Sequence, residues 1–269
     1  MTGRVVRISL APVKSLGLVH PDEVVLEPDG VPGNRRFWLV DGNGRLFNGK
    51  RGGPLVQIRP EWDEESRVLA LRFPDGRTVE AVVELGDDVD VELWGWPWAS
   101  RLVVGPWADA LSDAAGVPLR LLWADRHAVD RGMRGGTVSL VSRGSLERLG
   151  QEAGAEEPVD GRRFRMLFEI DGVEPHAEDE WLGVEVRVGE ATIVVNGDVG
   201  RCVVTTQDPD RGVTDLDTLR VLAGYRREGR HEELPFGVYG AVAVPGRVRV
   251  GDEVEPLPER VSAGAVRTT

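Results

Sequence analysis

Cysteine is nearly absent from this sequence. Cys202 is the single cysteine among 269 residues. One cysteine excludes an internal disulfide, and it also excludes an iron–sulfur cluster held by several thiolates of this chain. Free cysteines are usually small, buried apolar residues, so packing is the interpretation against which any role of Cys202 as a ligand must be weighed.

Long apolar runs are also missing. No early stretch shows a charged start followed by an unbroken apolar run of about 7–15 residues, which a signal peptide would need, and no membrane helix is evident. We therefore expect a cytoplasmic protein that does not interact with membranes.

Positive charge is scarce, and lysine is scarcer still. The net charge is −12, which argues against nucleic-acid binding because such proteins display clustered basic surface. Among 33 Lys and Arg residues, only Lys14 and Lys50 are lysines. A lysine retained in an arginine-rich chain raises the question of whether a site needs a compact ammonium group instead of a planar guanidinium.

Short β-branched runs between turn residues make up most of the chain, and 41% of its residues are hydrophobic, enough for a sizeable core. Strands are predicted at 4–10, 24–26, 36–40, 45–48, 55–58, 68–73, 79–83, 118–123, 138–141, 164–170, 184–188, 191–195, 242–244 and 247–250. Helical patterns cover 107–115, 144–149 with Ser142 as the N-cap, and 215–225. We expect a mainly β fold with some helix (α+β), divided into a domain at 1–105, a helical linker at 106–118, a second domain at 119–258 and a flexible tail at 259–269.

The stretch 200–212 holds most of the remaining chemistry: Gly-Arg-Cys-Val-Val-Thr-Thr-Gln-Asp-Pro-Asp-Arg-Gly. The β-branched residues 203–206 predict a strand that starts at Cys202, beside a loop. Arg201 and Arg211 bring positive charge, which favours the thiolate, the form of cysteine that binds metals. These residues alone leave packing and metal ligation both open.

Other common site motifs lack support. The segment 44–51 approaches a nucleotide-binding loop, but it ends in Arg51 where Ser or Thr is required, and no helix follows. The four histidines are scattered through the chain and form no short-spaced pair of the zinc-protease kind. Ser142 and Ser145 lie outside any Gly-x-Ser-x-Gly elbow, so serine-hydrolase chemistry is not supported either.

The ordered motif Arg-Cys-x-x-Thr-Thr-x-Asp-Pro-Asp-x-Gly resembles the signature of the MOSC superfamily, which includes molybdenum-cofactor sulfurases and amidoxime-reducing components. The resemblance implies an N-terminal β-barrel domain and a C-terminal MOSC β-barrel domain, with a molybdopterin-type molybdenum cofactor in the cleft between them. In the family this cysteine ligates molybdenum, so Cys202 is the expected metal ligand and catalytic residue. Thr205, in the same motif, is an expected cofactor-binding residue.

Further family motifs extend the resemblance from Arg4 to about Pro256. A Pro-Val-Lys-Ser sequence implies that Lys14 and Ser15 bind the phosphate end of the cofactor, and an ammonium beside a hydroxyl suits a phosphate dianion. An Arg-Arg-Phe-Trp-Leu-Val sequence implies a cofactor contact by Arg36. Arg-Phe-Arg and Phe-Gly-Val-Tyr sequences imply that Arg165 and Tyr239 approach the cofactor.

The sequence departs from the family pattern at three places. Met166 and Leu167 replace a Pro-Asn pair, and Arg-Gly-Gly-Thr at 134–137 stands where amidoxime-reducing members place an Asp and a Ser. Gly200 replaces a Ser two positions before the cysteine. These losses lie on the metal side, where polar groups orient ligands and tune a metal centre.

The resemblance implies reduction of N-hydroxylated or N-oxygenated small molecules, with oxygen-atom transfer supplied by the cofactor. Electrons are expected from a separate flavin or iron–sulfur reductase, because the chain has no cysteine cluster and no recognisable flavin or dinucleotide motif. Two alternatives stay open. Cys202 could hold a persulfide or carry cofactor in a sulfur-transfer or carrier protein, or the departures at Leu167 and Gly136 could mark a non-catalytic binding module.

Overall fold

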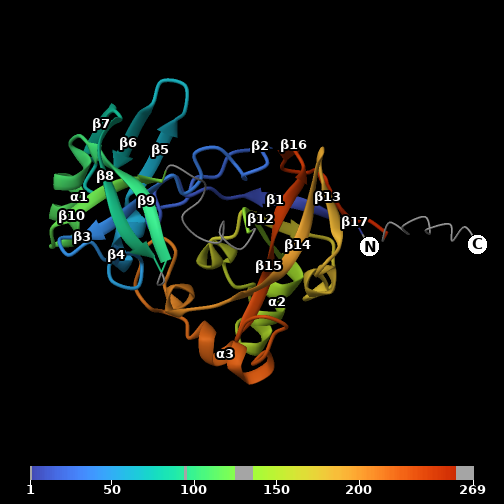
Figure 1. The fold of residues 1–269 in the computed structure, drawn as a ribbon. Helices are drawn as coiled ribbons and strands as arrows, with labels where there is room; N and C mark the ends of the chain where they lie inside the picture. Colours follow the sequence, from blue (N-terminus) through green and yellow to red (C-terminus); the bar gives the residue numbers. More distant parts are fainter. Residues whose placement is uncertain (1, 94–95, 125–135, 259–269) are drawn as a thin grey trace, which may run out of the picture.

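The structure is a computed structural model that describes residues 2–93, 96–124 and 136–258 (Figure 1). The expected flexible tail at 259–269 and residues 134–135 of one family departure lie outside the described residues. Within the described ranges strands predominate over helices, which confirms the expected mainly β class. None of the helices in these ranges is long and apolar enough to cross a membrane.

Two lobes lie side by side, and the right-hand lobe of Figure 1 is a closed barrel. In barrel order its strands are β1 (Gly3–Ile8), β12 (Phe168–Asp171), β11 (Val138–Ser142), β15 (Pro235–Val244), β14 (Ala191–Gly200), β13 (Glu185–Val188) and β17 (Glu253–Pro256). Alternate side chains point inward, so Val186, Val188 and Ile193 share one fully buried core. A short pair, β2 (Glu23–Leu26) with β16 (Gly246–Arg249), adds Leu26 and Val248 to that core.

The other lobe is built from two sheets. The larger has the order β4 (Leu46–Phe47), β3 (Phe37–Asp41), β10 (Leu119–Ala124), β9 (Trp96–Val104) and β8 (Glu84–Leu93), and the smaller has β5 (Arg59–Asp63), β6 (Val68–Arg72) and β7 (Thr78–Val82). Helix α1 (Trp107–Ala115) confirms the predicted helix and ends at Gly116 in the left-handed conformation. Its Trp107 is fully buried and donates from Nε1 to the carbonyl of Leu69 at 3.0 Å, which ties the helix to the smaller sheet.

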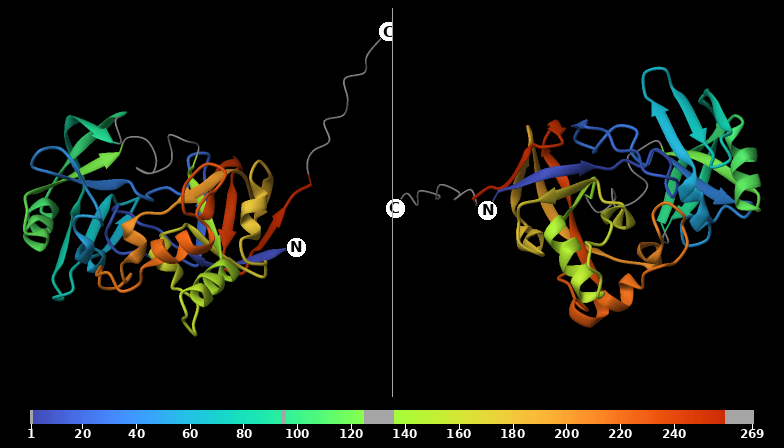
Figure 2. Two further views of the ribbon diagram at one scale, coloured as in Figure 1. Left: turned by 90° about the horizontal axis from the view of Figure 1, so that it is seen from below. Right: turned by 180° about the vertical axis from the view of Figure 1, so that it is seen from behind.

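Besides α1, the described ranges hold two α-helices and four 3-10 helices, of which α2 and α3 lie against each other beside the barrel (Figure 2), whereas η1 contacts α1 in the first lobe. These elements are α2 (Arg143–Glu152), α3 (Thr218–Tyr225) and the 3-10 helices η1 (Gly53–Gln57), η3 (Gly161–Phe164), η4 (Ala177–Trp181) and η5 (Val203–Thr206). Ser142 caps α2 as predicted, because its side chain accepts the backbone N–H of Ser145.

The two lobes are interleaved in sequence more than we expected. Strand β1 begins the chain but closes the barrel of the second lobe through β12 and β17. The strand predicted at 118–123 was expected to open the second domain, but it corresponds to β10, which pairs with β3 and β9 in the first lobe. Trp123 explains this placement, since it stacks edge-on against Phe37 at 5.2 Å within the first lobe's core.

Two predicted strands are wrong, because 55–58 and 203–206 lie mostly in 3-10 helices. Pro54 occupies the first turn of η1, where its fixed φ is compatible with a helical turn. In η5 the hydroxyls of Thr205 and Thr206 donate to carbonyls three residues earlier, at 3.1 and 2.8 Å, so local side-chain bonds replace strand pairing. Similarly, the strand predicted from 164 begins only at Phe168, because η3 precedes it.

Candidate cofactor-binding cleft

A cleft of about 840 Å³ lies between the lobes. Its lining comes from both: residues of 9–15, 34–35 and 48–56 on one side, and of 136–139, 163–167 and 199–207 with Glu232 on the other. This volume falls within the roughly 300–1,000 Å³ typical of small-molecule and cofactor sites. Interlobe position and size together make it the candidate functional site.

Five of the seven residues singled out from the sequence line this cleft: Lys14, Ser15, Arg165, Cys202 and Thr205. The first two come from the segment between β1 and β2, and the others follow η3 and β14. Residues far apart in the chain therefore meet at one site, although their roles there stay predictions.

Arg36 is not among the described lining residues. Its guanidinium donates to the carbonyl of Ala124 at 3.2 Å and lies 4.8 Å from the ring centroid of Trp123, inside the first lobe. The preceding Arg35 lines the cleft instead, and it donates to the carbonyl of Arg165 at 2.8 Å across the two lobes. Adjacent residues of one segment thus face different environments.

Tyr239 is also outside the described lining. It is buried in β15, between Ser139 of β11 and Gly197 of β14. A Cβ atom added to Gly197 would lie 2.6 Å from the Tyr239 hydroxyl, so the ring covers this glycine. Tyr239 therefore packs against β14, the strand that leads to Cys202, and its direct contact with a cofactor stays a prediction.

Cys202 follows the end of β14 and occupies the N-cap position of η5, where it is partly exposed. It is therefore not sealed in the apolar core, and its role as a metal ligand stays a prediction. The Arg201 guanidinium donates to the carbonyls of Phe236 and Phe164, at 2.9 Å and 3.1 Å, and so anchors the backbone beside the cysteine. Thr205 contributes in a similar way, since its hydroxyl donates to the carbonyl of Cys202 and bonds the hydroxyl of Thr218 at 2.8 Å.

Backbone strain is concentrated at the cleft. Ser15, Arg35 and Arg165 all adopt left-handed conformations, with φ of 79°, 54° and 53°. Only three further non-glycine residues in the described ranges do so. Such conformations are unfavourable for side chains with a Cβ and tend to cluster at functional sites, where surrounding structure enforces them. Arg165 shows this enforcement, as its guanidinium donates to the carbonyl of Leu16 in the opposite lobe at 2.7 Å.

The described lining is strongly cationic. Glu232 is its one carboxylate, against six cationic side chains: Lys14, Arg35, Lys50, Arg163, Arg165 and Arg201. This balance is the reverse of the chain's net charge of −12. An anionic ligand is therefore favoured in the cleft, because low-dielectric walls concentrate the potential of one sign.

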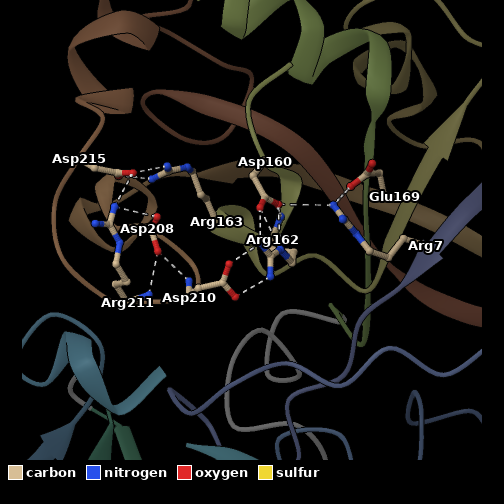
Figure 3. Close-up of polar contacts among 9 residues, drawn as sticks. All are labelled: Arg7, Asp160, Arg162, Arg163, Glu169, Asp208, Asp210, Arg211 and Asp215. Carbon is tan, nitrogen blue, oxygen red and sulfur yellow. Dashed lines mark hydrogen bonds and ion pairs between the residues drawn. The ribbon is translucent and has the colours of Figure 1, made fainter. Parts of the chain in front are cut away.

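An ion-pair network holds the segment after Cys202 to the segment that carries Arg165 (Figure 3). Arg163 makes two parallel hydrogen bonds to Asp215, at 2.6 and 2.7 Å, and Arg162 makes two to Asp210, both at 2.8 Å. The hydrogen bond from Arg163 holds the pKa of Asp215 below its ordinary value. Bidentate pairs of this kind fix geometry as well as charge, so the Asp-Pro-Asp part of the motif positions η5.

Three further lining residues, Asn48, Gly49 and Lys50, belong to the segment rejected as a nucleotide-binding loop. That rejection agrees with the structure, since the segment leads into η1 instead of an α-helix. The scarcity of lysine is the sequence signal that points to Lys50. Glu232, by contrast, sits in a polar loop without any motif that would have identified it.

The departures from the family pattern also lie at the cleft. Met166 and Leu167 line it and are nearly buried. Gly136 lines it as well, and Gly200 lies where Glu232 approaches the backbone. Within the described ranges, no group of three or more His, Cys, Asp and Glu side chains is arranged to hold a metal ion.

Comparison with protein-family models agrees with this architecture. The model of the MOSC N-terminal beta barrel domain matches residues 2–111, and the model of the MOSC domain matches residues 128–255. The chain therefore belongs to the family of proteins in which a MOSC N-terminal beta barrel domain precedes a MOSC domain. The expected family and domain types are confirmed.

Among curated proteins, two kinds of relative are similar to the chain. Mitochondrial amidoxime-reducing component 1 of Mus musculus is 36% identical over 122 residues, covering 43% of this chain and 35% of the relative. Molybdenum cofactor sulfurase of Drosophila grimshawi is 28% identical over 253 residues, covering 88% of this chain and 32% of the relative. The chain spans about a third of the length of these relatives.

Proposed function

We propose that the chain binds a molybdopterin-type molybdenum cofactor in the interlobe cleft and reduces N-hydroxylated or N-oxygenated small molecules. The single observation that carries this proposal is the meeting of a partly exposed Cys202 with basic side chains of both lobes in one cleft. The similarity to proteins named for amidoxime reduction and for the molybdenum cofactor supports it.

The residues of the cleft suit such a cofactor. Lys14 and Ser15 offer an ammonium and a hydroxyl to the phosphate, and Arg35 and Arg165 offer planar guanidinium groups to an anionic ligand. The volume of about 840 Å³ leaves room for a cofactor and a small substrate. The departures at Met166 and Leu167 make part of the wall apolar and leave the basic groups in place.

When bound, the cofactor would supply two-electron oxygen-atom transfer, and the protein would hold it and exclude competing reactions. The Cys202 sulfur would be the protein's ligand to the metal, with molybdenum and tungsten both open. Thr205 and Arg201 would act by positioning, because they bind the backbone around Cys202. Thr205 would therefore support the cofactor site indirectly, through its hydrogen bond to the Cys202 carbonyl.

Electrons would come from a separate flavin or iron–sulfur reductase. The chain carries one cysteine and hence no thiolate cluster of its own. Its cytoplasmic location and its lack of nucleic-acid and membrane partners stay predictions from composition.

The decisive experiment is elemental and pterin analysis of the wild type and Cys202→Ala, both made in a cofactor-competent host. We expect molybdenum and pterin in the wild type, and retained pterin without reductase activity in Cys202→Ala, since the basic groups survive. A wild-type protein without either component, and without affinity for added cofactor, would contradict the proposal and favour a non-catalytic binding module.

A sulfur-transfer or cofactor-carrier role is the second candidate. The sulfurase relatives favour it, because their similarity covers 88% of this chain, whereas the similarity to the mouse amidoxime-reducing component covers 43%. In that role Cys202 would carry a persulfide. Mass spectrometry would then find one extra sulfur on Cys202 that dithiothreitol releases, in protein that contains no metal.

A further inference from the structure

A second cavity, of about 310 Å³, adjoins the interlobe cleft, and the proposed function gives it no role. We call it the small cavity, and its described lining comes from residues 17–20, 56–59, 74, 162–165 and 204–210. Its volume lies at the lower end of the range for small-molecule sites. Arg163 and Arg165 line both cavities, whereas Arg59 and Arg162 are among the described lining of the small cavity alone.

Close backbone packing and ion pairs hold the walls of the small cavity. Gly17 donates its N–H to the carbonyl of Ile58 at 2.8 Å, and a Cβ atom on Gly17 would lie 2.9 Å from that oxygen. The missing side chain therefore lets this segment lie directly on the one that leads to Arg59, the first residue of β5. On the other side, Arg162 makes two hydrogen bonds to Asp210, both at 2.8 Å (Figure 3). The cavity is therefore a formed part of the fold.

Positive charge is in excess in the small cavity. Its described lining holds more arginines than carboxylates: Arg59, Arg162, Arg163 and Arg165 against Asp208 and Asp210. Both carboxylates are already engaged, because Asp210 binds Arg162 and Asp208 accepts a hydrogen bond from Arg211 at 3.2 Å. Like charges that converge without a counterion are unfavourable. An anion between the arginines would remove this repulsion.

Two donors at the small cavity lack an acceptor in the described part of the chain. Arg59 is exposed, and no hydrogen bond or ion pair of its guanidinium to a described residue is seen. Arg163 places both terminal nitrogens on Asp215, and its buried Nε has no hydrogen-bond partner. Buried donors are nearly always satisfied in proteins, so an orphaned one indicates that a ligand group or ion is bound nearby.

We propose that the small cavity binds the phosphoryl group of a small molecule, at a site separate from the cofactor. A phosphoryl group offers three strong acceptor oxygens, and guanidinium groups bind it through parallel charge-assisted hydrogen bonds. Arg59 of the first lobe and Arg163 of the second would hold this anion between them. Leu18, Pro74 and Pro209 offer an apolar surface to the rest of the ligand. The inference does not depend on the proposed function, because it concerns a different cavity.

Two probes test the inference and identify the source of the phosphoryl group. Inorganic phosphate and phenyl phosphate would each be titrated into the full chain by isothermal titration calorimetry at constant ionic strength. We expect saturable binding of both. Tighter binding of phenyl phosphate would assign the site to a phosphate ester, and equal affinity would assign it to free phosphate. Absence of saturable binding of either probe would overturn the inference.

Three variants locate the bound anion. Arg59→Gln should weaken binding of both probes about tenfold or more, because a charge-assisted hydrogen bond is lost. Arg45→Gln is the matched control and should keep the wild-type affinity, since Arg45 is an exposed arginine of the same lobe outside the described lining of both cavities. Lys14→Gln should also keep it, because Lys14 lines the interlobe cleft. Unchanged affinity in Arg59→Gln, or loss of binding in Lys14→Gln alone, would overturn the inference, and the latter result would place the anion in the interlobe cleft.

Discussion

Two polar clusters of the protein differ mainly in how easily a ligand can reach their side chains. The interlobe cleft holds one thiol among basic side chains, whereas the cluster between α2, η4 and α3 holds serine, histidine and carboxylate groups. In this second cluster, which we call the buried cluster (Ser142, Ser145, His176, Glu178, Asp179 and Tyr225), Ser145 donates to Glu178 at 2.7 Å. By residue type it resembles a hydrolase site more closely than the cleft does.

Burial explains why we assign chemistry to the cleft instead. Ser145 and Glu178 are fully buried, and the buried cluster lines neither of the two clefts found between the lobes. Desolvation raises the pKa of Glu178, and desolvation followed by the charges of Arg226 and Arg148 lowers the pKa of His176 to about 4. The ring nitrogens of His176 and the Oε2 atom of Glu178 are also shielded from solvent inside the fold. A cluster of reactive residue types is therefore a candidate site only where a ligand can reach its side chains.

The largest expected effect is a loss of activity when Cys202 in the interlobe cleft is replaced. Cys202→Ser should reduce reductase activity by at least about 100-fold, because loss of even an outer-sphere partner of a metal ligand has effects of 10–100-fold. The melting temperature should change little, since the side chain is partly exposed. Steady-state kinetics of the purified variant measure the activity, and thermal denaturation measures the melting temperature. Activity retained after this substitution would remove the main distinction between the clusters.

The corresponding experiment in the buried cluster is Ser145→Ala. It removes a donor to Glu178 and the acceptor of the His176 backbone N–H, and it should lower the free energy of unfolding by about 1–3 kcal/mol. Activity per folded molecule should stay at the wild-type level. Urea denaturation gives the stability, and kinetics at a temperature where both proteins are folded give the activity. A loss of turnover without a loss of stability would show that this cluster takes part in the reaction.

A smaller effect separates two adjacent arginines. Arg35→Gln should weaken cofactor retention by about tenfold, because a charge-assisted contact is lost from the cleft. Arg36→Gln should leave retention unchanged and destabilise the first lobe, where Arg36 lies over Trp123. Pterin content after dialysis, quantified by fluorescence, compares the two variants. The opposite result would support the direct role of Arg36 that the family resemblance implied.

The smallest effect is the pH dependence that His176 contributes. Its pKa is lowered in the folded state, so the unfolded chain binds more protons between about pH 6.5 and about pH 4. Stability must therefore fall as the pH falls through this window, by about 1 kcal/mol at about pH 5.5. The raised pKa of Glu178 has the opposite sign, because the folded state then holds the extra proton.

His176→Asn isolates the histidine contribution. Asparagine tolerates the left-handed backbone found at this position, where φ is 64°, and it does not titrate. We expect the difference in unfolding free energy between wild type and variant to shrink as the pH falls from 7 to 5. Urea titrations at several pH values measure it, and a constant difference would show that His176 is not held neutral.

Much of the secondary structure followed from local pattern. The helix at 107–115 ends at a glycine, and Ser142 caps the next helix, because both signals act within a few residues. The wrong strand at 203–206 has a local cause too: β-branched residues favour strands, but two threonine hydroxyls bonded to their own backbone instead. The pattern could not distinguish these outcomes, since the same residue type serves both.

By itself the sequence determined the mainly β class and the MOSC family, because these depend on residue identity and spacing along the chain. Only the tertiary structure decided that Arg35 instead of Arg36 lines the cleft, that the strand at 119–124 joins the first lobe, and that Glu232 lies against Gly200. Each of these depends on contacts between segments distant in sequence. Local propensity carries no information about such contacts, since they form only when the lobes pack together.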